Sequence, residues 1–231
     1  MDEVDLDVSA PQPEDLEEAA TIAAQALLDS PPYRHVCSEG TDSATREAFL
    51  KFLFLRNFRM AIGYGCCRGA YETSKSDDGG ADKHELVCFF MFVPQQGGLQ
   101  QPGLCDMLRA GIFGSVLRFG LGPTLGLVRI TRWAEQIEQE ILKGRKVIRL
   151  EGMVVKPSRQ SMGIGTRAIG PALEEADSLG LEVFLATQDE RSLAFYHRLG
   201  FRVMHEATYE PGGFVSWFML RAPGGATAGA P

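Results

Sequence analysis

The stretch that decides the fold is RQSMGIG, residues 159–165, which lies between a strand-like apolar segment, 150–155, and a helical segment, 163–179. Gly163 and Gly165 lack a Cβ, so a ligand can approach the backbone closely at these positions. The first N–H groups of the following helix have no acceptor within the helix. A loop of this kind is expected to bind a phosphate or a pyrophosphate.

Two other interpretations of the same glycines exist. Together with Ala168, they also satisfy the G-x-G-x-x-G/A pattern of dinucleotide-binding folds. In those folds the first glycine lies in the tight turn that leaves the strand, whereas residues 156–162 intervene here, and Glu182 begins the next strand instead of ending it. A purely structural glycine turn is the second alternative. Phosphate binding fits the context of the loop better than either.

The rest of the chain alternates between the two hydrophobic periodicities. A period of two predicts strands, and helical spacing predicts helices. Strands are expected at 4–8, 65–71, 86–93, 147–155, 181–187, 201–206 and 214–220, and helices at 14–28, 44–60, 131–142, 163–179 and 189–199. This order predicts a mixed α/β layer fold. We expect one domain over residues 1–221, followed by a disordered tail, 222–231, of small residues, Gly and Pro.

Composition and charge exclude several functions. The chain has 231 residues, 45% of them hydrophobic, and a net charge of -7. Nucleic-acid binding needs clustered Lys and Arg, which the sequence lacks, so nucleic acid is not an expected partner. The apolar stretch 103–130 is interrupted by Arg109, Arg118 and Pro123, and no run reaches the roughly 20 apolar residues that span a membrane.

The five cysteines are odd in number, form no C-x-x-C pair, and follow an acidic start that is unlike a secretory signal. These features predict a cytoplasmic protein with reduced thiols. No spacing of Cys and His is typical of a metal site, so no metal is expected.

Two motifs carry a resemblance to a known family. The pattern Gln160-x-x-Gly163-x-Gly165, preceded by Val-Lys-Pro at 155–157, resembles the acyl-CoA-binding motif of the GCN5-related N-acetyltransferase (GNAT) family. The segment DERSLAFYHRLGF, residues 189–201, is similar to the downstream segment of that family. The resemblance implies a mostly antiparallel central sheet that is flanked by helices and splayed between its central strands.

The resemblance also implies acetyl-CoA as cosubstrate and a set of backbone and side-chain contacts to it. The coenzyme is expected to contact Met153, Val154, Val155, Gln160, Ser161, Met162, Gly163, Ile164, Gly165, Thr166 and Ser192. The N–H of Val154 is expected to stabilise the oxyanion of the tetrahedral intermediate. Ser192 stands where the family often has an asparagine, and its shorter side chain is expected to weaken coenzyme binding.

Two residues are the catalytic candidates, and each has an alternative interpretation. Tyr196 matches the family tyrosine near the coenzyme sulfur and could protonate the leaving thiolate, or it could simply pack in the core with Phe195. Glu151 matches a glutamate that orients or deprotonates the amine, or it could form an ion pair with Arg149 or Arg167.

The implied function is that of a transferase. It moves an acetyl group from acetyl-CoA to an amine of a small molecule or peptide by direct attack in a ternary complex. The alternatives are a catalytically weak acyl-CoA-binding or interaction protein of the same fold, and an enzyme for longer acyl chains. The sequence leaves the acceptor and the oligomeric state open.

Overall fold

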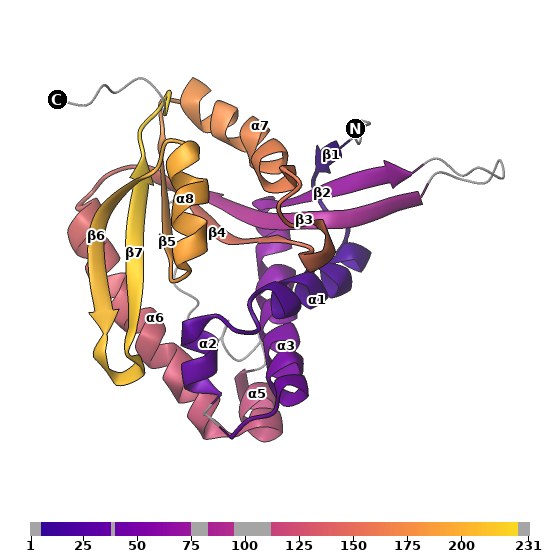
Figure 1. The fold of residues 1–231 in the computed structure, drawn as a ribbon, viewed down its shortest axis with the longest axis vertical. Coiled ribbons are helices and arrows are strands. Elements are labelled where there is room, and N and C mark those ends of the chain that lie inside the picture. The colour runs from indigo at the N-terminus through magenta and orange to yellow at the C-terminus, as the bar shows by residue number, and fades with distance from the viewer. Residues whose placement is uncertain (1–5, 38–39, 75–82, 95–111, 226–231) are drawn as a thin grey trace.

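The computed structural model describes residues 6–37, 40–74, 83–94 and 112–225. These residues contain a seven-stranded sheet with the order β1-β2-β3-β4-β5-β7-β6 (Figure 1). The strands are β1 (Leu6–Ser9), β2 (Cys67–Ser74), β3 (Lys83–Pro94), β4 (Val147–Val155), β5 (Glu182–Thr187), β6 (Arg202–Tyr209) and β7 (Phe214–Arg221). Neighbouring strands pair antiparallel except for β4 and β5, which are parallel. The predicted mixed, mostly antiparallel sheet is therefore confirmed.

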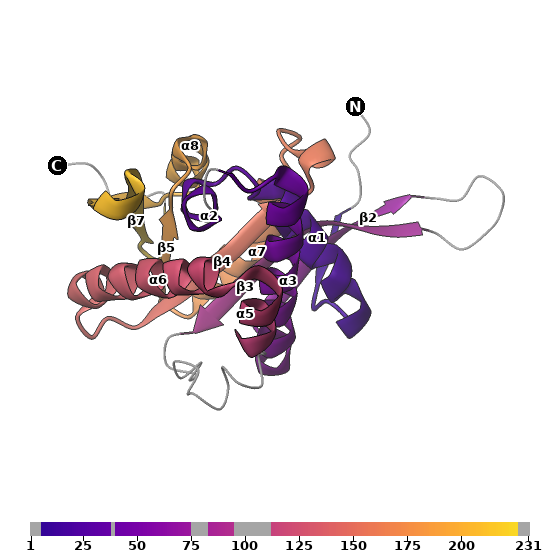
Figure 2. The same cartoon turned by 90° about the horizontal axis from the view of Figure 1, so that it is seen from below.

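Helices cover both faces of this sheet. They are α1 (Leu16–Ala26), α2 (Pro31–Val36), α3 (Ser43–Ala61), α5 (Ile112–Phe119), α6 (Leu121–Leu142), α7 (Ile164–Ser178) and α8 (Glu190–Arg198). One apolar core lies between the sheet and α1 with α3, and a second lies between the opposite face and α7 with α8. Figure 2 shows α6 and α8 on opposite sides of β5.

Helix α6 connects two parts of the core. Leu127 and Ile130, from its first half, pack against the α1–α3 core. Ala134, Ile137 and Ile141, from its second half, pack against a third cluster formed by residues of β4, β5 and β7. The spacing of these three residues is the helical one, so a single stripe of α6 faces the sheet.

Three helices differ from the sequence prediction. Helix α6 begins at Leu121 and not at residue 131, because Pro123 lies in its first turn, where the missing N–H costs no intrahelical hydrogen bond. Helices α2 and α5 have no counterpart among the expected helices. In α2, Pro31 occupies the first position, for which the fixed φ of proline is suited.

The sheet opens between β4 and β5, as predicted. Their pairing covers three residue pairs and stops at Arg149 with Phe184, although β4 continues to Val155. The pairing of β4 with β3 shifts at the same level, because Glu151 stands opposite Met91 and Val154 opposite Phe89. A β-bulge of this kind turns the strand away from its neighbour, and bulges are frequent next to active sites.

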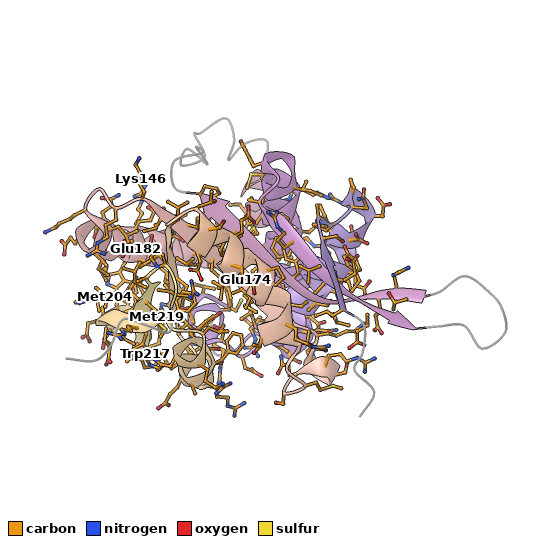
Figure 3. The ribbon with its side chains drawn as sticks, turned by 90° about the horizontal axis from the view of Figure 1, so that it is seen from above. Lys146, Glu174, Glu182, Met204, Trp217 and Met219 are labelled. Carbon is orange, nitrogen blue, oxygen red and sulfur yellow. The ribbon has the colours of Figure 1, made fainter. Side chains whose placement is uncertain are left out.

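Strand β6 forms one edge of the sheet, and most of its residues are exposed. Met204 on this strand is 48% exposed, and Figure 3 shows it at the edge near Trp217. The Trp217 indole N–H donates a hydrogen bond of 3.0 Å to Glu206, which ties the edge strand to β7 on the exposed side.

The C-terminal end of the described chain is fixed by an ion pair. The Arg221 guanidinium donates to both carboxylate oxygens of Asp177 on α7, at 2.6 and 2.8 Å. The Gly224 N–H donates to the same carboxylate at 2.8 Å. Residues 222–225 of the predicted tail are thus part of an ordered turn, whereas 226–231 lie outside the described residues, so for them disorder stays a prediction.

Candidate functional site

The loop 160–163 leads into α7 through two left-handed residues. Ser161 has φ 63° and Gly163 has φ 75°. A Cβ on Gly163 would meet no atom within 4 Å, so glycine is needed here for the backbone angle and the space beside it is open. The sequence pattern that singled out Gly163 therefore corresponds to a real conformational requirement.

The N-terminus of α7 has no side-chain cap and no acidic residue in its first turn. The first helical hydrogen bond runs from Arg167 N to Gly163 O, so the N–H groups of 164–166 precede the hydrogen-bonded helix. By contrast, α8 is capped by Asp189 and has Glu190 in its first turn. Within the described chain, α7 thus begins with the partial positive charge that attracts an anion.

Gly165 has a different role from the one inferred from its sequence. A Cβ there would lie 3.3 Å from the Phe195 ring and 3.4 Å from the Met153 methyl group. The space is therefore filled by side chains of α8 and β4, which pack closely on the first turn of α7. Gly165 sets the distance between these three elements, and only its backbone N–H is available to a ligand.

An ion-pair network anchors the loop to the neighbouring strands. Arg159 Nε lies 2.8 Å from the carboxylate of Glu72 on β2, which is 8% exposed. Lys156 Nζ lies 2.5 Å from Glu85 on β3 and 3.3 Å from Glu18 on α1. The hydrogen bond that Lys156 donates to Glu85 is the main cause that raises the pKa of Lys156. Both cations thus serve to hold the loop in position.

The structure places the predicted coenzyme contacts in one region, with differences in exposure. Met153 and Val155 are half-buried, Val154 is 3% exposed, and Ile164 is 1% exposed, so the last two can offer only backbone groups. Ser161, Met162 and Thr166 are exposed around the loop. The Gln160 side chain donates to the Val155 carbonyl at 3.2 Å and closes the loop against the end of β4.

Ser192 lies in the first turn of α8. Its hydroxyl donates to the Asp189 carboxylate at 2.8 Å, and the same carboxylate accepts from the Arg191 N–H at 3.1 Å. The side chain is therefore engaged in capping its own helix.

Tyr196 lies on the same face of the sheet as the loop. Its ring packs edge-to-face on Phe195 and Phe201, with centroids 5.1 and 5.6 Å apart. Burial is the main cause that raises the pKa of the Tyr196 phenol above its usual range, and Cys88 and Asp189 add to it. Because Cys88 pairs with Val155 across β3 and β4, the phenol lies near the end of β4 that is paired with β3 but no longer with β5. The phenol stays protonated at any physiological pH.

Glu151 lies at the bulge of β4, on the sheet face that α6 covers. Arg149 Nε lies 3.1 Å from one of its oxygens, and the Glu151 side chain is 40% exposed. Of the two partners considered from the sequence, Arg149 is the one that contacts it. The ion pair occupies one carboxylate oxygen and leaves the other available. The contact is therefore compatible with Glu151 as the residue that orients or deprotonates the amine and with Glu151 as a simple ion-pair partner.

Sequence reasoning missed Glu138, which completes this cluster from α6. Its Oε2 lies 2.6 Å from Arg149 Nη2, and the residue is 7% exposed. Burial raises the pKa of Glu138 to about 7, against the lowering effect of Arg149. The signal was an acidic residue next to the apolar stripe of the expected helix 131–142, but the sequence did not show which strand this helix would lie against.

None of the helices in the described residues is long and apolar enough to cross a bilayer. No group of three or more His, Cys, Asp or Glu side chains is arranged to hold a metal ion among these same residues.

Comparison with known proteins identifies the family. A model of the acetyltransferase (GNAT) family matches residues 119–201, which include β4, the loop, α7 and α8. The glucosamine 6-phosphate N-acetyltransferase of Trypanosoma brucei brucei is 33% identical over 124 residues, which are 53% of this chain and 81% of that protein.

Solved structures agree in fold at low identity. One from Corynebacterium glutamicum ATCC 13032, described as histone acetyltransferase HPA2 and related acetyltransferase, has a TM-score of 0.60 at 14% identity and covers 98% of both chains. The polyamine N acetyltransferase of Drosophila melanogaster has a TM-score of 0.57 at 12% identity, over 94% of this chain and 100% of that one. The family model and the 33% identical relative together establish that the chain belongs to the acetyltransferase (GNAT) family and is an N-acetyltransferase.

Proposed function

We propose that this N-acetyltransferase moves an acetyl group from acetyl-CoA to the primary amine of a small molecule, by direct attack of the amine within a ternary complex. The observation that carries the proposal is the open, left-handed turn at Gly163, which leads into the uncapped N-terminus of α7 beside the gap between β4 and β5. A pyrophosphate fits this turn because it needs N–H donors and room next to the backbone.

Each part of the donor has a group to contact. The N–H groups of 164–166 would bind the pyrophosphate, and Met162 and Thr166 line the open side of the same loop. The end of β4, from Met153 to Val155, would contact the pantetheine arm through backbone groups that have no partner in β5 beyond Arg149. The Lys156 N–H donates to the Val87 carbonyl and Val154 stands opposite Phe89, so the Val154 backbone groups face β3. The N–H that would stabilise the oxyanion without reorganisation is therefore one on the open side of β4, that of Met153 or Val155.

The acceptor side requires a base, because amines are largely protonated at neutral pH. In this proposal the Glu151 carboxylate takes one proton from the ammonium group. The nitrogen lone pair then forms the C–N bond to the thioester carbonyl carbon, and the C–S bond breaks as the tetrahedral intermediate collapses. The partly exposed side chain of Glu151 at the bulge is suited to meet an amine that enters from the α6 face.

Tyr196 acts in this proposal as a hydrogen-bond donor to the thiolate. Protonating a thiolate from an ordinary phenol is already uphill by about 2 kcal/mol, since the pKa values are roughly 10 and 8.5. Burial raises the pKa of Tyr196 further, so complete proton transfer from it is disfavoured. The thiolate therefore departs as an anion that is stabilised by this hydrogen bond. The second proton, which the nitrogen loses as the tetrahedral intermediate collapses, reaches the thiolate through water.

The test has a binding arm and a turnover arm. Calorimetry should detect binding of acetyl-CoA to the full chain, with desulfo-CoA as the matched ligand that keeps the pyrophosphate. Release of free thiol should then depend on one member of an amine panel that contains glucosamine 6-phosphate, agmatine, polyamines and a peptide N-terminus. Absence of coenzyme binding would refute the proposal, and acetylation of the peptide alone would move the acceptor class from small molecules to peptides.

A second candidate is a catalytically weak acyl-CoA-binding protein of the same fold. Two observations favour it: the Ser192 hydroxyl is already held by Asp189, and Glu151 by Arg149. It predicts coenzyme binding without turnover over the whole panel, so a single acetylated amine rejects it. The preference for acetyl over longer acyl chains, the independence of metal and the cytoplasmic location stay predictions from the sequence.

A further inference from the structure

One guanidinium joins two carboxylates that come from different elements. Arg149 Nη2 lies 2.6 Å from Glu138 on α6, and its Nε lies 3.1 Å from Glu151 on β4. The two acids differ in environment, because the Glu138 side chain is 9% exposed and the Glu151 side chain is 40% exposed. The inner acid is thus held by the protein, and the outer one can meet a substrate.

The charges around this cluster do not balance. Besides Arg149 and Glu151, the group that acts on Glu138 is Glu135, one turn earlier on α6. On the other side, the hydrogen bond with Cys67 is the main cause that lowers the pKa of Cys66, which lies before β2, and the Glu151 charge acts against this lowering. Two carboxylates therefore share one close guanidinium, with a third acid, Glu135, one turn away on α6.

We propose that Glu138 is a positioning residue for the transfer reaction: through Arg149 it holds the Glu151 carboxylate toward the opening between β4 and β5 and strengthens it as the acceptor of the substrate's proton. The inference rests on the proposed role of Glu151. When Glu151 gains the proton, the Arg149 charge is left entirely to Glu138, so the ion pair with α6 persists throughout the reaction. Removing the inner charge makes Glu151 a weaker base.

The same geometry explains why the acid on α6 is buried. An ionised carboxylate in the core is costly unless it is paired and hydrogen-bonded, and Arg149 is its partner. Burial raises the pKa of Glu138 to about 7, against the lowering effect of Arg149, so the ion pair between Glu138 and Arg149 is complete above neutral pH.

The test compares Glu138→Gln with Glu140→Gln, the same change at an exposed position of the same helix. The kcat/KM of each variant and of the wild type is measured between about pH 5.5 and 9.5, with the acetyl-CoA Kd and the melting temperature alongside. In Glu138→Gln we expect the acid limb to move down by about one pH unit and kcat to fall about tenfold, with the coenzyme Kd unchanged, because a base loses roughly tenfold in proton affinity per unit of pKa. Glu140→Gln should match the wild type.

A profile of Glu138→Gln that superimposes on that of the wild type would overturn the proposal, and so would a loss of kcat without movement of the acid limb. A second measurement needs no turnover: the Glu151 carboxyl carbon is titrated by NMR in ¹³C-glutamate-labelled wild type and Glu138→Gln. A lower titration midpoint of Glu151 in Glu138→Gln than in the wild type supports the inference, even if no amine is acetylated. If no amine is acetylated, the proposed function fails, but the inference about Glu138 stands. Should Glu138→Gln not fold, Glu138→Met, which removes the same charge without leaving a buried amide, must show the same lower midpoint.

Discussion

The left-handed turn at Gly163 makes a prediction that separates folding from binding. Gly163 and Gly180 bracket α7, with φ 75° and 65°, and a Cβ on either would meet no atom within 4 Å. Alanine at either position therefore suffers only from its backbone angle, which costs about 1–2 kcal/mol. In a chain of this size, that corresponds to a fall in melting temperature of about 2–8 °C.

Binding should distinguish the two variants. In Gly163→Ala the new methyl group occupies the open space beside the first N–H groups of α7, whereas Gly180→Ala changes the opposite end of the helix. Loss of a charge-assisted hydrogen bond costs about 1.5–3 kcal/mol. We therefore expect Gly163→Ala to bind acetyl-CoA about ten- to a hundredfold more weakly than the wild type, and Gly180→Ala to bind it equally well.

The measurements are urea unfolding at 25 °C and calorimetric titration with acetyl-CoA at the same pH and salt concentration. Gly163→Asn provides a further control, because asparagine tolerates the left-handed region and should recover part of the stability without recovering affinity. Equal affinity of Gly163→Ala and Gly180→Ala would refute the assignment of the pyrophosphate to this turn. An unfolding curve of Gly163→Ala identical to that of the wild type would refute the turn geometry itself.

Three further predictions concern single side chains. Arg159→Ala leaves the buried Glu72 carboxylate without its closest partner, so we expect a loss of about 3 kcal/mol in unfolding free energy by urea titration, and a Glu72→Gln background should remove most of that loss. Tyr196→Phe should lower kcat about ten- to a hundredfold in the thiol-release assay. The alkaline limb of the pH profile should stay unchanged, because burial keeps the phenol protonated. Loss of this limb in Tyr196→Phe would contradict the prediction. The Arg221 guanidinium lowers the pKa of Asp177, so this pair stabilises the fold at neutral pH and the stabilisation is lost progressively as pH falls below about 4. Asp177→Asn should be less stable than the wild type in urea at pH 7, and the difference should shrink as the pH is lowered toward 3; a difference independent of pH would exclude the ion pair as its cause.

The phosphate loop could be predicted from the sequence because its geometry is encoded locally. A glycine in the left-handed region, at the junction of an apolar strand and a helix, leaves a pattern that three or four residues suffice to define. Gly163 is such a residue. Ser161 has the same kind of backbone angle, but serine carries no comparable signal.

The acceptor side could not be predicted in the same way. Glu138 lies within the expected helix 131–142, but it is important only because α6 packs on β4 and brings it to Arg149, which depends on tertiary packing and not on a local pattern. The role of Gly165 also depends on tertiary packing. Its sequence context suggests room for a ligand, whereas the structure shows that Phe195 and Met153 pack against it and leave no space for a side chain.

Only three residue pairs join β4 to β5, so the sheet consists of two halves with a short connection. Helix α6 bridges the two halves, because Leu127 packs against the core of the first and Ile141 against the core of the second. Acetyl-CoA bound between β4 and β5 would bridge them a second time, on the open side. Amide protons of β5 should then exchange with deuterium more slowly when acetyl-CoA is bound, while those of β2, deep within the first half, should keep their rate.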